Sequence, residues 1–364
     1  MNYKIKNVLL KLIDRGFEAY LVGGFVRDYI LGIESFDVDI STNALPKDVM
    51  DIFDLNNSND ENYGSVHFKD SLYNYDITTF RKEFNYSNRK PVDMEYASSI
   101  EEDVKRRDFT INALYMDVDG NIHDLVDGKK DLEKGIIRSI GNINNKMTED
   151  PLRLLRAVRF AATFDFSIES NLYSFIRQNK QLLRTISYSR KKIELSKMFK
   201  ADNKLQGIKL IRELDIASEL ELKIPEHVAF VEDELGIWAQ LEFKSDYPFK
   251  NSELDTIAAI RKVMRYGIID NAVLYECGLY VCMIAGEILG VPRGVISELY
   301  KNMPIYTVKD IALDGDDIIS ILGIEPSNVI KDIIFDLELN ILNGNLKNDY
   351  DSLKQYLLKN WRAV

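Results

Sequence analysis

The sequence predicts an α+β protein in which a small α/β head with a mixed sheet is followed by an all-α neck, body and tail. Short apolar runs typical of strands occur early in the chain, and segments with helical spacing of apolar residues fill the rest. A chain of 364 residues also exceeds what one hydrophobic core organises. We therefore predict a head at residues 1–140, a neck at 141–204, a body at 205–265 and a tail at 266–364.

The head begins with a helix, a strand, a glycine pair and a second helix. Apolar residues recur at helical spacing in residues 1–18, and the short apolar run Ala19–Val22 predicts a buried strand. Gly23 and Gly24 end this strand, and an amphipathic run begins at Phe25. Backbone N–H groups at a helix start bind phosphate through hydrogen bonds and the helix dipole, and glycine lets a phosphate approach. We therefore predict a phosphate site at this turn.

Two aspartates follow on the next predicted strand, residues 36–42. Alternation along the strand places Asp37 and Asp39 on one face, with Phe36, Val38 and Ile40 on the other. Two neighbouring carboxylates repel each other unless a cation lies between them, and oxygen ligands suit Mg²⁺ held together with substrate phosphates. An exposed strand edge or turn is the alternative for such a pair alone. Combined with the glycine turn, the pair favours nucleotidyl transfer.

The rest of the head supplies a third acidic candidate. We predict a helix at residues 44–53, strands at 64–68 and 73–80, a mobile polar loop at 81–94, and a hairpin made by 111–119 and 121–124. On the strand 73–80, Asp76 alternates with Tyr75 and Ile77. We expect Asp76 to reach the metals as a third carboxylate; a surface acid is the alternative.

A basic segment begins near the end of the head. Residues 1–133 carry 16 Lys and Arg against 26 Asp and Glu, residues 134–212 carry 17 against 6, and residues 213–364 carry 14 against 26. A basic middle between acidic ends is typical of a phosphate-rich ligand held at one place. A solvated basic helix bundle is the alternative.

Within the basic segment, residues 148–161 predict a helix with Thr148 or Asp150 as its cap and Pro151 in its first turn. Three arginines recur every three residues and form one stripe with Asp150: Arg153, Arg156 and Arg159. Leu154, Leu155 and Val158 are predicted to face the core. In the alternative reading, Asp150 only caps the helix and the arginines are solvated.

Composition limits the class of protein further. The 46% hydrophobic content is ordinary for a soluble globular protein, and no apolar run reaches the ~18 residues of a membrane span. The first residues lack the apolar core of a signal peptide. Cys277 and Cys282 are the only cysteines, and their spacing suits neither a zinc site nor a disulfide framework. A reducing, cytoplasmic location is the expectation.

Four motifs together resemble the class II tRNA nucleotidyltransferase and poly(A) polymerase family, in its bacterial type without a His-Asp phosphohydrolase domain. The first is G-G-x-V-R-D-x-x-L-G followed by D-x-D in residues 23–39, and the second is R-R-D-F-T-I-N-A in residues 106–113. The third, E-D-x-x-R, spans Glu149–Arg153. The fourth, residues 186–195, keeps Arg190 and Glu194 but has Ser189 and Lys191 where the family has Glu and Ile, which leaves its helix-bracing role open.

The resemblance implies a role for each candidate residue. Asp37 and Asp39 would hold two Mg²⁺ ions, with Asp76 beside them as a third catalytic carboxylate. Gly24, Arg27 and Arg107 would bind the nucleotide, and Asp108 can fix an arginine through a bidentate pair. Asp150 and Arg153 would read the base edge of the incoming nucleotide, while Arg156 and Arg159 would face phosphate or RNA. The polar loop at 81–94 would be needed to add A after CC.

The implied activity is template-free addition of CCA to the 3′ end of tRNA from CTP and ATP, with release of pyrophosphate, in tRNA maturation and repair. An A-adding enzyme or poly(A) polymerase is the alternative within the class, and an inactive RNA-binding protein is the alternative outside it. The tail is expected to bind tRNA. A monomer and a homodimer are both compatible with the sequence.

Overall fold

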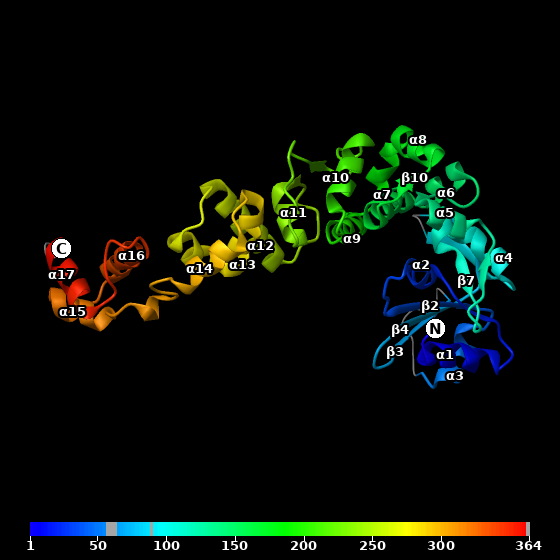
Figure 1. The fold of residues 1–364 in the computed structure, drawn as a ribbon, viewed down its shortest axis with the longest axis horizontal. Helices are drawn as coiled ribbons and strands as arrows, with labels where there is room; N and C mark the ends of the chain where they lie inside the picture. Colours follow the sequence, from blue (N-terminus) through cyan, green and yellow to red (C-terminus); the bar gives the residue numbers. More distant parts are fainter. Residues whose placement is uncertain (56–63, 88–89, 362–364) are drawn as a thin grey trace. The chain divides into compact units, whose positions relative to one another are not determined.

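The computed structural model describes residues 1–55, 64–87 and 90–361. The chain divides into two compact units, Met1–Glu221 and Leu222–Val364. Figure 1 shows the order of the elements along each unit. A mixed sheet with helices in the first unit, followed by helical regions, confirms the predicted α+β class.

The elements of the first unit follow the predicted order closely. Its helices are α1 (Tyr3–Ile13), α2 (Gly23–Leu31), α3 (Pro46–Phe53), α4 (Ile100–Asp103), α5 (Gly128–Lys134), α6 (Ile143–Glu149), α7 (Leu152–Phe164), α8 (Ser170–Gln178), α9 (Tyr188–Phe199) and α10 (Lys204–Glu213). Its strands are β1 (Ala19–Leu21), β2 (Asp37–Thr42), β3 (Ser65–Lys69), β4 (Asn74–Thr79), β5 (Arg81–Ser87), β6 (Lys90–Tyr96), β7 (Leu114–Met116), β8 (Ile122–Asp124), β9 (Ile136–Ile137) and β10 (Ser167–Ile168). Short 3₁₀ helices are η2 (Val104–Arg106), η3 (Thr110–Asn112) and η4 (Lys180–Thr185).

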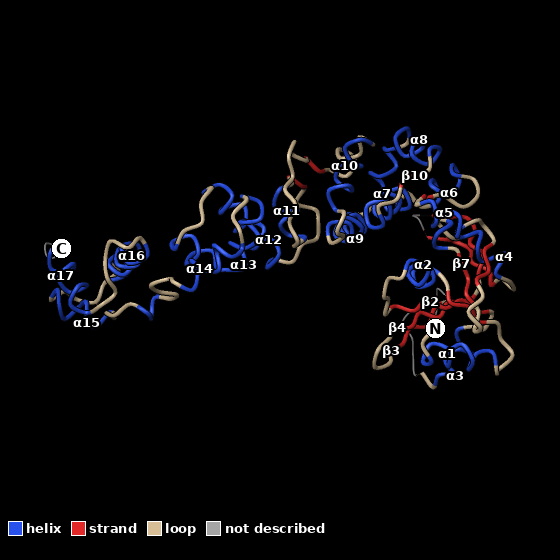
Figure 2. The backbone as a smooth tube through the Cα atoms, in the orientation of Figure 1, coloured by secondary structure: helices blue, strands red, loops and turns tan. Residues whose placement is uncertain are grey.

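A six-stranded sheet forms the centre of the head. Its strand order is β3-β4-β2-β1-β7-β8, and only the β2–β4 pair is parallel, so the sheet is mixed as predicted. Figure 2 shows β2 and β4 in red between α2, drawn above them, and α1 and α3, drawn below. Val38 and Ile40 are each 1% exposed, whereas Asp37 on the alternate face is exposed. Phe36, predicted to share the face of Val38 and Ile40, lies before the strand and is 45% exposed.

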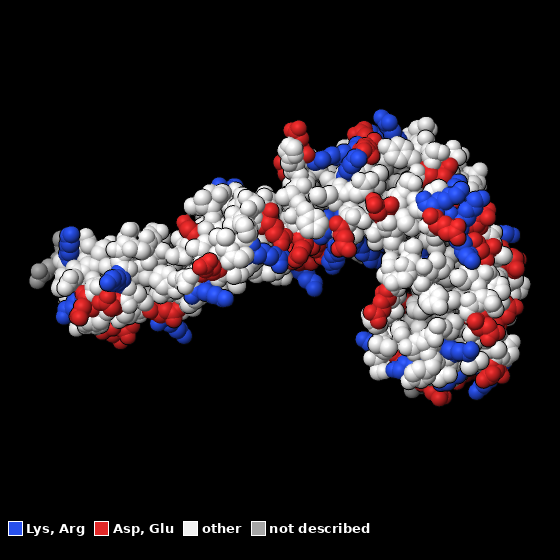
Figure 3. Space-filling view, viewed as in Figure 1, with Lys and Arg blue, Asp and Glu red and all other residues white. Residues whose placement is uncertain are grey.

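Acidic and basic side chains are intermixed on the surface of the first unit. Figure 3 shows red and blue side chains next to one another over the elements that Figure 1 labels α5 and α6. One such pair joins Arg138 Nε to Asp131 Oδ2 of α5 at 3.0 Å. The surface is therefore not uniformly basic where the basic segment begins.

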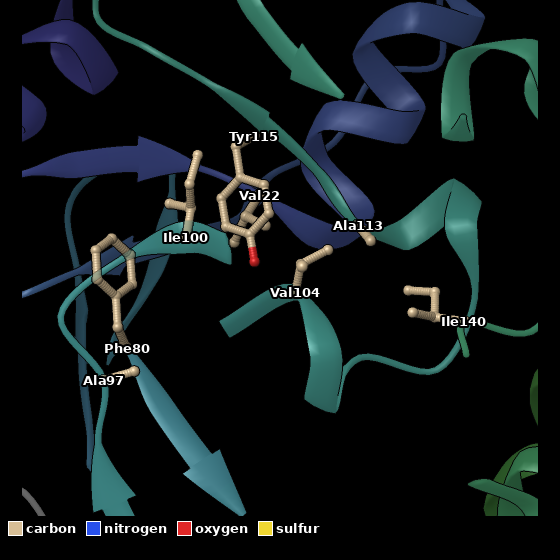
Figure 4. Packing of buried hydrophobic residues seen from close by; sticks show 8 residues of the cluster. All are labelled: Val22, Phe80, Ala97, Ile100, Val104, Ala113, Tyr115 and Ile140. Carbon is tan, nitrogen blue, oxygen red and sulfur yellow. The ribbon is translucent and has the colours of Figure 1, made fainter. Parts of the chain in front are cut away.

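A buried cluster joins the sheet to the segment around the R-R-D-F-T motif. Its members are Val22, Phe80, Ala97, Ile100, Val104, Ala113, Tyr115 and Ile140. In Figure 4 the Tyr115 ring lies in front of Val22, and its hydroxyl points toward the space between Ile100 and Val104. The hydroxyl donates to Asp103 Oδ2 at 2.7 Å, so a polar contact lies at the edge of this apolar cluster.

The predicted helix at residues 148–161 is interrupted near its start. Thr148 lies within α6, Asp150 lies between the two helices, and α7 begins at Leu152. Thr148 is therefore not a cap, whereas Asp150 Oδ1 accepts the Leu152 N–H at 3.2 Å. The side chains of α7 predicted to face the core, Leu154, Leu155 and Val158, are at most 1% exposed.

The predicted loop at residues 81–94 is instead a β-hairpin. Strands β5 and β6 pair antiparallel, with Arg81 opposite Tyr96 and Ser87 opposite Lys90. The hairpin forms a sheet of its own, separate from the six-stranded sheet. A polar sequence is compatible with an antiparallel strand pair, because antiparallel strands can face water on one side.

The second unit is helical apart from one short strand pair. Its elements are β11 (Leu222–Lys223), α11 (Glu234–Gln240), β12 (Glu242–Phe243), α12 (Asn251–Tyr266), α13 (Asn271–Leu289), α14 (Arg293–Lys301), η5 (Val308–Asp310), α15 (Gly315–Leu322), α16 (Val329–Leu342) and α17 (Tyr350–Asn360). Asp314 caps α15 at its start, and Gly323 ends it with a φ of 65°.

Helix α13 is long and apolar enough to cross a membrane by length and composition, although a core helix also passes that test. Gly278 has a φ of 78° and a ψ of 160°, which breaks the helical path inside α13. The helix carries Glu276, which is paired with Lys262, and Glu287, which is paired with Arg293. Neither segment beside Gly278 has the ~20 residues that a helical membrane span needs.

Candidate active site

A cavity of about 760 Å³ lies within the first unit, between the sheet, α2, α7 and α9. Its walls contain every candidate site residue from the sequence: Gly24, Arg27, Asp37, Asp39, Asp76, Arg107, Asp150, Arg153, Arg156 and Arg159. These residues come from positions more than a hundred residues apart, and the fold brings them to one place.

Three carboxylates gather at the sheet side of this cavity. Strands β2 and β4 are parallel and in register, so Asp39 lies opposite Asp76 and Asp37 lies opposite Asn74. Asn74 Nδ2 donates to Asp37 Oδ1 at 2.7 Å, and the Gly24 N–H donates to Asp39 Oδ2 at 3.3 Å. The period of two along each strand, predicted from the sequence, places all three carboxylates on one face.

The carboxylates are electrostatically unfavourable in the absence of a cation. Burial, followed by the neighbouring charge of Asp76, raises the pKa of Asp39 to about 6. Burial also raises the pKa of Asp76. In the described residues, no three His, Cys, Asp or Glu side chains are grouped closely enough to hold a metal ion as they stand. The donor set nevertheless fits a hard divalent cation, because it offers only carboxylate oxygens that repel one another.

The absence of a side chain at Gly23 leaves room for the Asp39 carboxylate and also allows the backbone to turn. Helix α2 begins at Gly23, two residues before the predicted start, and Gly23 has a φ of 67°. A Cβ on Gly23 would lie 2.8 Å from Asp39 Oδ2, so a side chain there would displace Asp39. The sequence explained this glycine by phosphate approach; the structure adds the close approach of a carboxylate and a left-handed backbone.

Arg107 is held rigidly where it lines the cavity. Its Nε and NH2 groups donate to Asp103 Oδ2 at 3.1 and 2.9 Å, and NH2 also donates to Ser41 Oγ at 2.9 Å. Burial opposes its charge, but Asp103 and Tyr115 outweigh burial and raise the pKa of Arg107. Asp103 is fully buried and also accepts from Arg106 Nε at 2.7 Å. The guanidinium therefore stays charged and fixed.

Asp108 pairs with an arginine as predicted, and the partner is Arg156. Arg156 donates to Asp108 Oδ2 through Nε at 2.8 Å and lies 2.6 Å from it through NH2. Burial would raise the pKa of Asp108, but the charge of Arg156 outweighs it and lowers the pKa to about 2. Asn112 links the pair onward, because its Nδ2 donates to Asp108 and its Oδ1 accepts from Arg27 NH1 at 2.7 Å.

The two candidate base readers have different partners. Arg190 donates to both carboxylate oxygens of Asp150, at 3.4 and 3.2 Å. Arg153 is buried, and its NH1 donates to the Lys146 carbonyl oxygen at 2.7 Å and to Glu149 Oε2 at 3.3 Å. Asp150 and Arg153 both line the cavity, and the Arg153 backbone N–H donates to the Asp150 carbonyl oxygen at 3.0 Å, whereas their side chains contact the different partners just named.

Helix α9 braces the arginine stripe. Glu194 Oε2 accepts from Arg159 Nε at 2.5 Å, and its other oxygen lies 3.9 Å from Arg156 NH1. The fourth motif keeps Arg190 and Glu194. Arg190 contacts Asp150 at one end of the stripe, and Glu194 contacts Arg159 at the other end. The unusual Lys191 is 1% exposed and donates to the Glu219 carbonyl oxygen at 3.1 Å.

The sequence did not single out Asp103, Asn112 or Arg190 as site residues. Asn112 and Arg190 act through partners far away in the chain, at 85 residues for Arg27 and 40 for Asp150, whereas Asp103 holds the nearby Arg107. The signal that could have found Arg190 was its retention in an otherwise altered motif.

Comparisons with known proteins agree with these motifs. Residues 19–138 match the family described as the poly A polymerase head domain, and residues 241–357 match tRNA nucleotidyltransferase domain 2. Residues 165–227 match a model for an RNA- and SrmB-binding site of polymerase A.

Curated relatives cover nearly the whole chain. The CCA-adding enzyme of Ligilactobacillus salivarius is 32% identical over 98% of this chain and 95% of its own length. That of Lactococcus lactis subsp. cremoris is 33% identical over 94% of this chain and 92% of its own length. The crystal structure of the Bacillus stearothermophilus CCA-adding enzyme in complex with CTP is similar with a TM-score of 0.85 and 26% identity, covering 99% of this chain and 98% of that one. The chain therefore belongs to the family of CCA-adding enzymes.

Proposed function

We propose that this protein adds C, C and A in turn to the 3′ end of tRNA, using CTP and ATP and no nucleic-acid template. One observation supports this most strongly: the carboxylates and the arginines that the motifs predicted line a single cavity of one unit. Carboxylates lie on its sheet side, and cationic side chains lie on α7 and around the R-R-D-F-T motif. This is the arrangement that transfer of a nucleotidyl group from a triphosphate requires.

In the reaction, the terminal 3′-hydroxyl oxygen of the RNA bonds to the α-phosphorus of the nucleotide, and the bond from that phosphorus to pyrophosphate breaks. Asp37 and Asp39 would hold the divalent cations, which we propose to be Mg²⁺, with Asp76 beside them. When bound, such ions activate the attacking hydroxyl and neutralise charge on the triphosphate. Burial raises the pKa values of Asp39 and Asp76, with the charge of Asp76 adding to the effect at Asp39, and a bound cation would offset this cost of ionisation, which supports the assignment.

Arg107, Arg27 and the start of α2 would bind the triphosphate. Arg107 is fixed by Asp103 and Ser41, and Arg27 is fixed by Asp28 and Asn112. Positively charged groups that are already oriented lose little entropy when a charged substrate binds, which favours transition-state stabilisation. Asp108 and Glu194 serve the same purpose by positioning Arg156 and Arg159.

Base choice would depend on Asp150 with an adjacent guanidinium. Cytosine and adenine each offer an exocyclic amine beside a ring nitrogen that accepts, whereas uracil and guanine offer a carbonyl beside a ring N–H. A carboxylate and a guanidinium complement the first pattern and oppose the second. Arg153 is the cation that the motif assigns, and Arg190 is the one that contacts Asp150 here.

The remaining assignments follow from this activity. We propose that the head at 1–140 performs the chemistry, that the neck at 141–204 recognises the base, and that the tail at 266–364, beyond the helical body at 205–265, binds tRNA. A cytoplasmic location is part of this proposal and is compatible with a tRNA substrate.

Substitution of the carboxylates tests the proposed chemistry. Asp37→Ala and Asp39→Ala should each abolish incorporation of CMP into a 3′-truncated tRNA, while the affinity for that tRNA stays within about twofold, because RNA is held elsewhere. Asp51→Ala, an exposed carboxylate change on α3, serves as the matched control and should keep full activity. Full incorporation by either site variant in the presence of Mg²⁺ would contradict the assignment.

A further inference from the structure

A second hollow, of about 450 Å³, lies on the same face of the sheet. It shares Asp37, Asp39 and Asp76 with the larger cavity, and its other polar side chains are His67, Lys69 and Asn74 from β3 and β4. The motifs account for none of these last three residues.

The strand register arranges the polar face into three cross-strand rows. The rows are Lys69–Asn74–Asp37, His67–Asp76–Asp39 and Ser65–Thr78–Ser41. Residues two apart on a strand share a face, so all nine side chains project from the same side of the sheet. His67 Nδ1 lies 3.4 Å from Asp76 Oδ1, and Ser65 Oγ lies 2.9 Å from Thr78 Oγ1, as expected for opposed residues.

The middle row, His67–Asp76–Asp39, thus has different neighbours on its two sides. On the side of the Ser41 row, Arg107 reaches in and bonds Ser41 Oγ at 2.9 Å, and the larger cavity continues to the arginines of α7. On the other side lie the Lys69 row and the second hollow. The triphosphate has its cationic partners on the Arg107 side.

In-line displacement requires the attacking oxygen and the leaving pyrophosphate to lie on opposite sides of the α-phosphorus. If pyrophosphate leaves toward Arg107, the 3′-hydroxyl must arrive from the opposite side of the carboxylates, where the second hollow lies. The end of the RNA would then pass over β3. Lys69 and His67 are both exposed there and can donate to phosphate oxygens.

Resting on the activity proposed above, we infer that the second hollow receives the 3′-terminal nucleotide of the acceptor RNA. Lys69 and His67 bind the phosphate that joins its last two nucleotides. This assigns binding residues for the RNA end on β3, separate from those for the incoming triphosphate. A contact of this kind positions the 3′-hydroxyl for attack.

Steady-state kinetics with both substrates varied separately tests the inference. Lys69→Gln and His67→Asn should each raise the KM for a tRNA acceptor about tenfold, in line with loss of a charge-assisted hydrogen bond near solvent. The KM for CTP should stay unchanged. Lys47→Gln, an exposed lysine change on α3, is the matched control and should match the parent in both constants.

A modified acceptor separates a direct contact from a structural effect. A tRNA acceptor with an uncharged methylphosphonate at its last internucleotide linkage should already bind weakly to the parent protein. The substitution Lys69→Gln should weaken the binding of this acceptor no further. An unchanged tRNA KM in both variants, or an equal additional loss on the methylphosphonate acceptor, would overturn the inference. A rise in the KM for CTP alone would instead place the triphosphate over β3. Lack of nucleotide addition by the parent would reject the proposed function itself.

Discussion

Asp39 is the residue at which stability and activity conflict most clearly. Its carboxylate is packed against the start of α2, accepts from the Gly24 N–H and lies opposite Asp76. A pKa raised to about 6 means that folding makes ionisation of this group unfavourable. A protein selected for stability alone would not keep such a group, so its presence supports a role in holding a cation.

Asp39→Asn should therefore stabilise the metal-free protein at pH 8. The folded-state pKa of about 6 exceeds the ordinary 3.8, so Asp39 does not destabilise the parent below pH 3.8. As the pH rises from there through 6, its ionisation lowers the parent's free energy of unfolding. We expect a gain in unfolding free energy on the order of 1–2 kcal/mol, allowing for solvent screening. The gain should shrink as the pH falls from 8 toward 5, as measured by urea unfolding.

Added Mg²⁺ should stabilise the parent and not the Asn variant, because ligand binding to the folded state raises its stability. Asp51→Asn, on the exposed surface of α3, should respond to Mg²⁺ as the parent does. Equal stabilisation of parent and Asp39→Asn by Mg²⁺ would show that Asp39 is not a ligand.

Asp150→Ala should change base choice. Removing the carboxylate leaves Arg190 without this partner and removes the acceptor for an exocyclic amine, so incorporation of C and A should fall and rejection of UTP should relax. Loss of such a partly buried, charged hydrogen bond costs on the order of 1 kcal/mol. Single-nucleotide incorporation with all four triphosphates measures the ratios.

Arg159→Ala is the comparison and should weaken RNA or phosphate binding while the CTP-to-UTP ratio stays the same. If Asp150→Ala keeps the CTP-to-UTP incorporation ratio of the parent, Asp150 acts only as a helix cap and does not read the base.

Residues with a role set by local spacing could be predicted from the sequence. Alternation placed Asp37 and Asp39 on one face, and the three-residue repeat placed Arg153, Arg156 and Arg159 on one wall of the cavity. Partners could not be predicted, because they depend on contacts between distant segments. The Asp150–Arg190 pair and the burial of Arg153 against Glu149 and Lys146 are examples.

At the scale of elements, the hairpin β5–β6 shows the limits of composition. Its polar sequence predicted a loop, since no apolar alternation marked the strands, yet backbone pairing across the hairpin makes it regular. Its base is tied to the active site: the Arg81 N–H donates to Asp103 Oδ1 at 3.4 Å, and Asp103 also holds Arg107. A change at the hairpin can therefore reach the nucleotide site through Asp103.

Deletion of residues 85–88 should leave C addition largely intact and reduce A addition at least about tenfold. The six-stranded sheet does not include the hairpin, so the deletion should not unfold the head. Position 88 lies outside the described residues, and the expectation rests on the family resemblance. Rates of C and A addition on matched tRNA ends measure the effect, and replacement of the four residues by Gly-Ser-Gly-Ser separates length from sequence. Equal loss of both additions would make the hairpin structural only.

The break between α6 and α7 has a consequence for the site. A continuous helix would have placed Asp150 on a helical turn below Arg153, as the spacing predicted. Instead, Asp150 has extended backbone, with a φ of −137° and a ψ of 95°, and its carboxylate both accepts the Leu152 N–H at the start of α7 and meets Arg190. Pro151 explains the break, because proline disfavours helical backbone at the residue before it.

At the scale of the whole molecule, all the described candidate chemistry belongs to the first unit. Both hollows on the sheet are lined by residues of Met1–Glu221. The basic stretch 134–212 also lies in this unit, and several of its arginines are neutralised by pairing, as with Arg156 and Asp108. The net charge of a segment could therefore be counted from the sequence, whereas the charge left to attract RNA could not.

The product sequence tests the central claim most directly. The full-length protein is incubated with Mg²⁺, all four nucleoside triphosphates and three tRNA acceptors that lack CCA, CA or A, and the products are sequenced. One cavity with its own base readers predicts that all three acceptors end in CCA and then stop, with U and G absent. Addition of A to the acceptor that lacks only A with no addition to the other two, long A tails, or no addition to any acceptor would contradict the account.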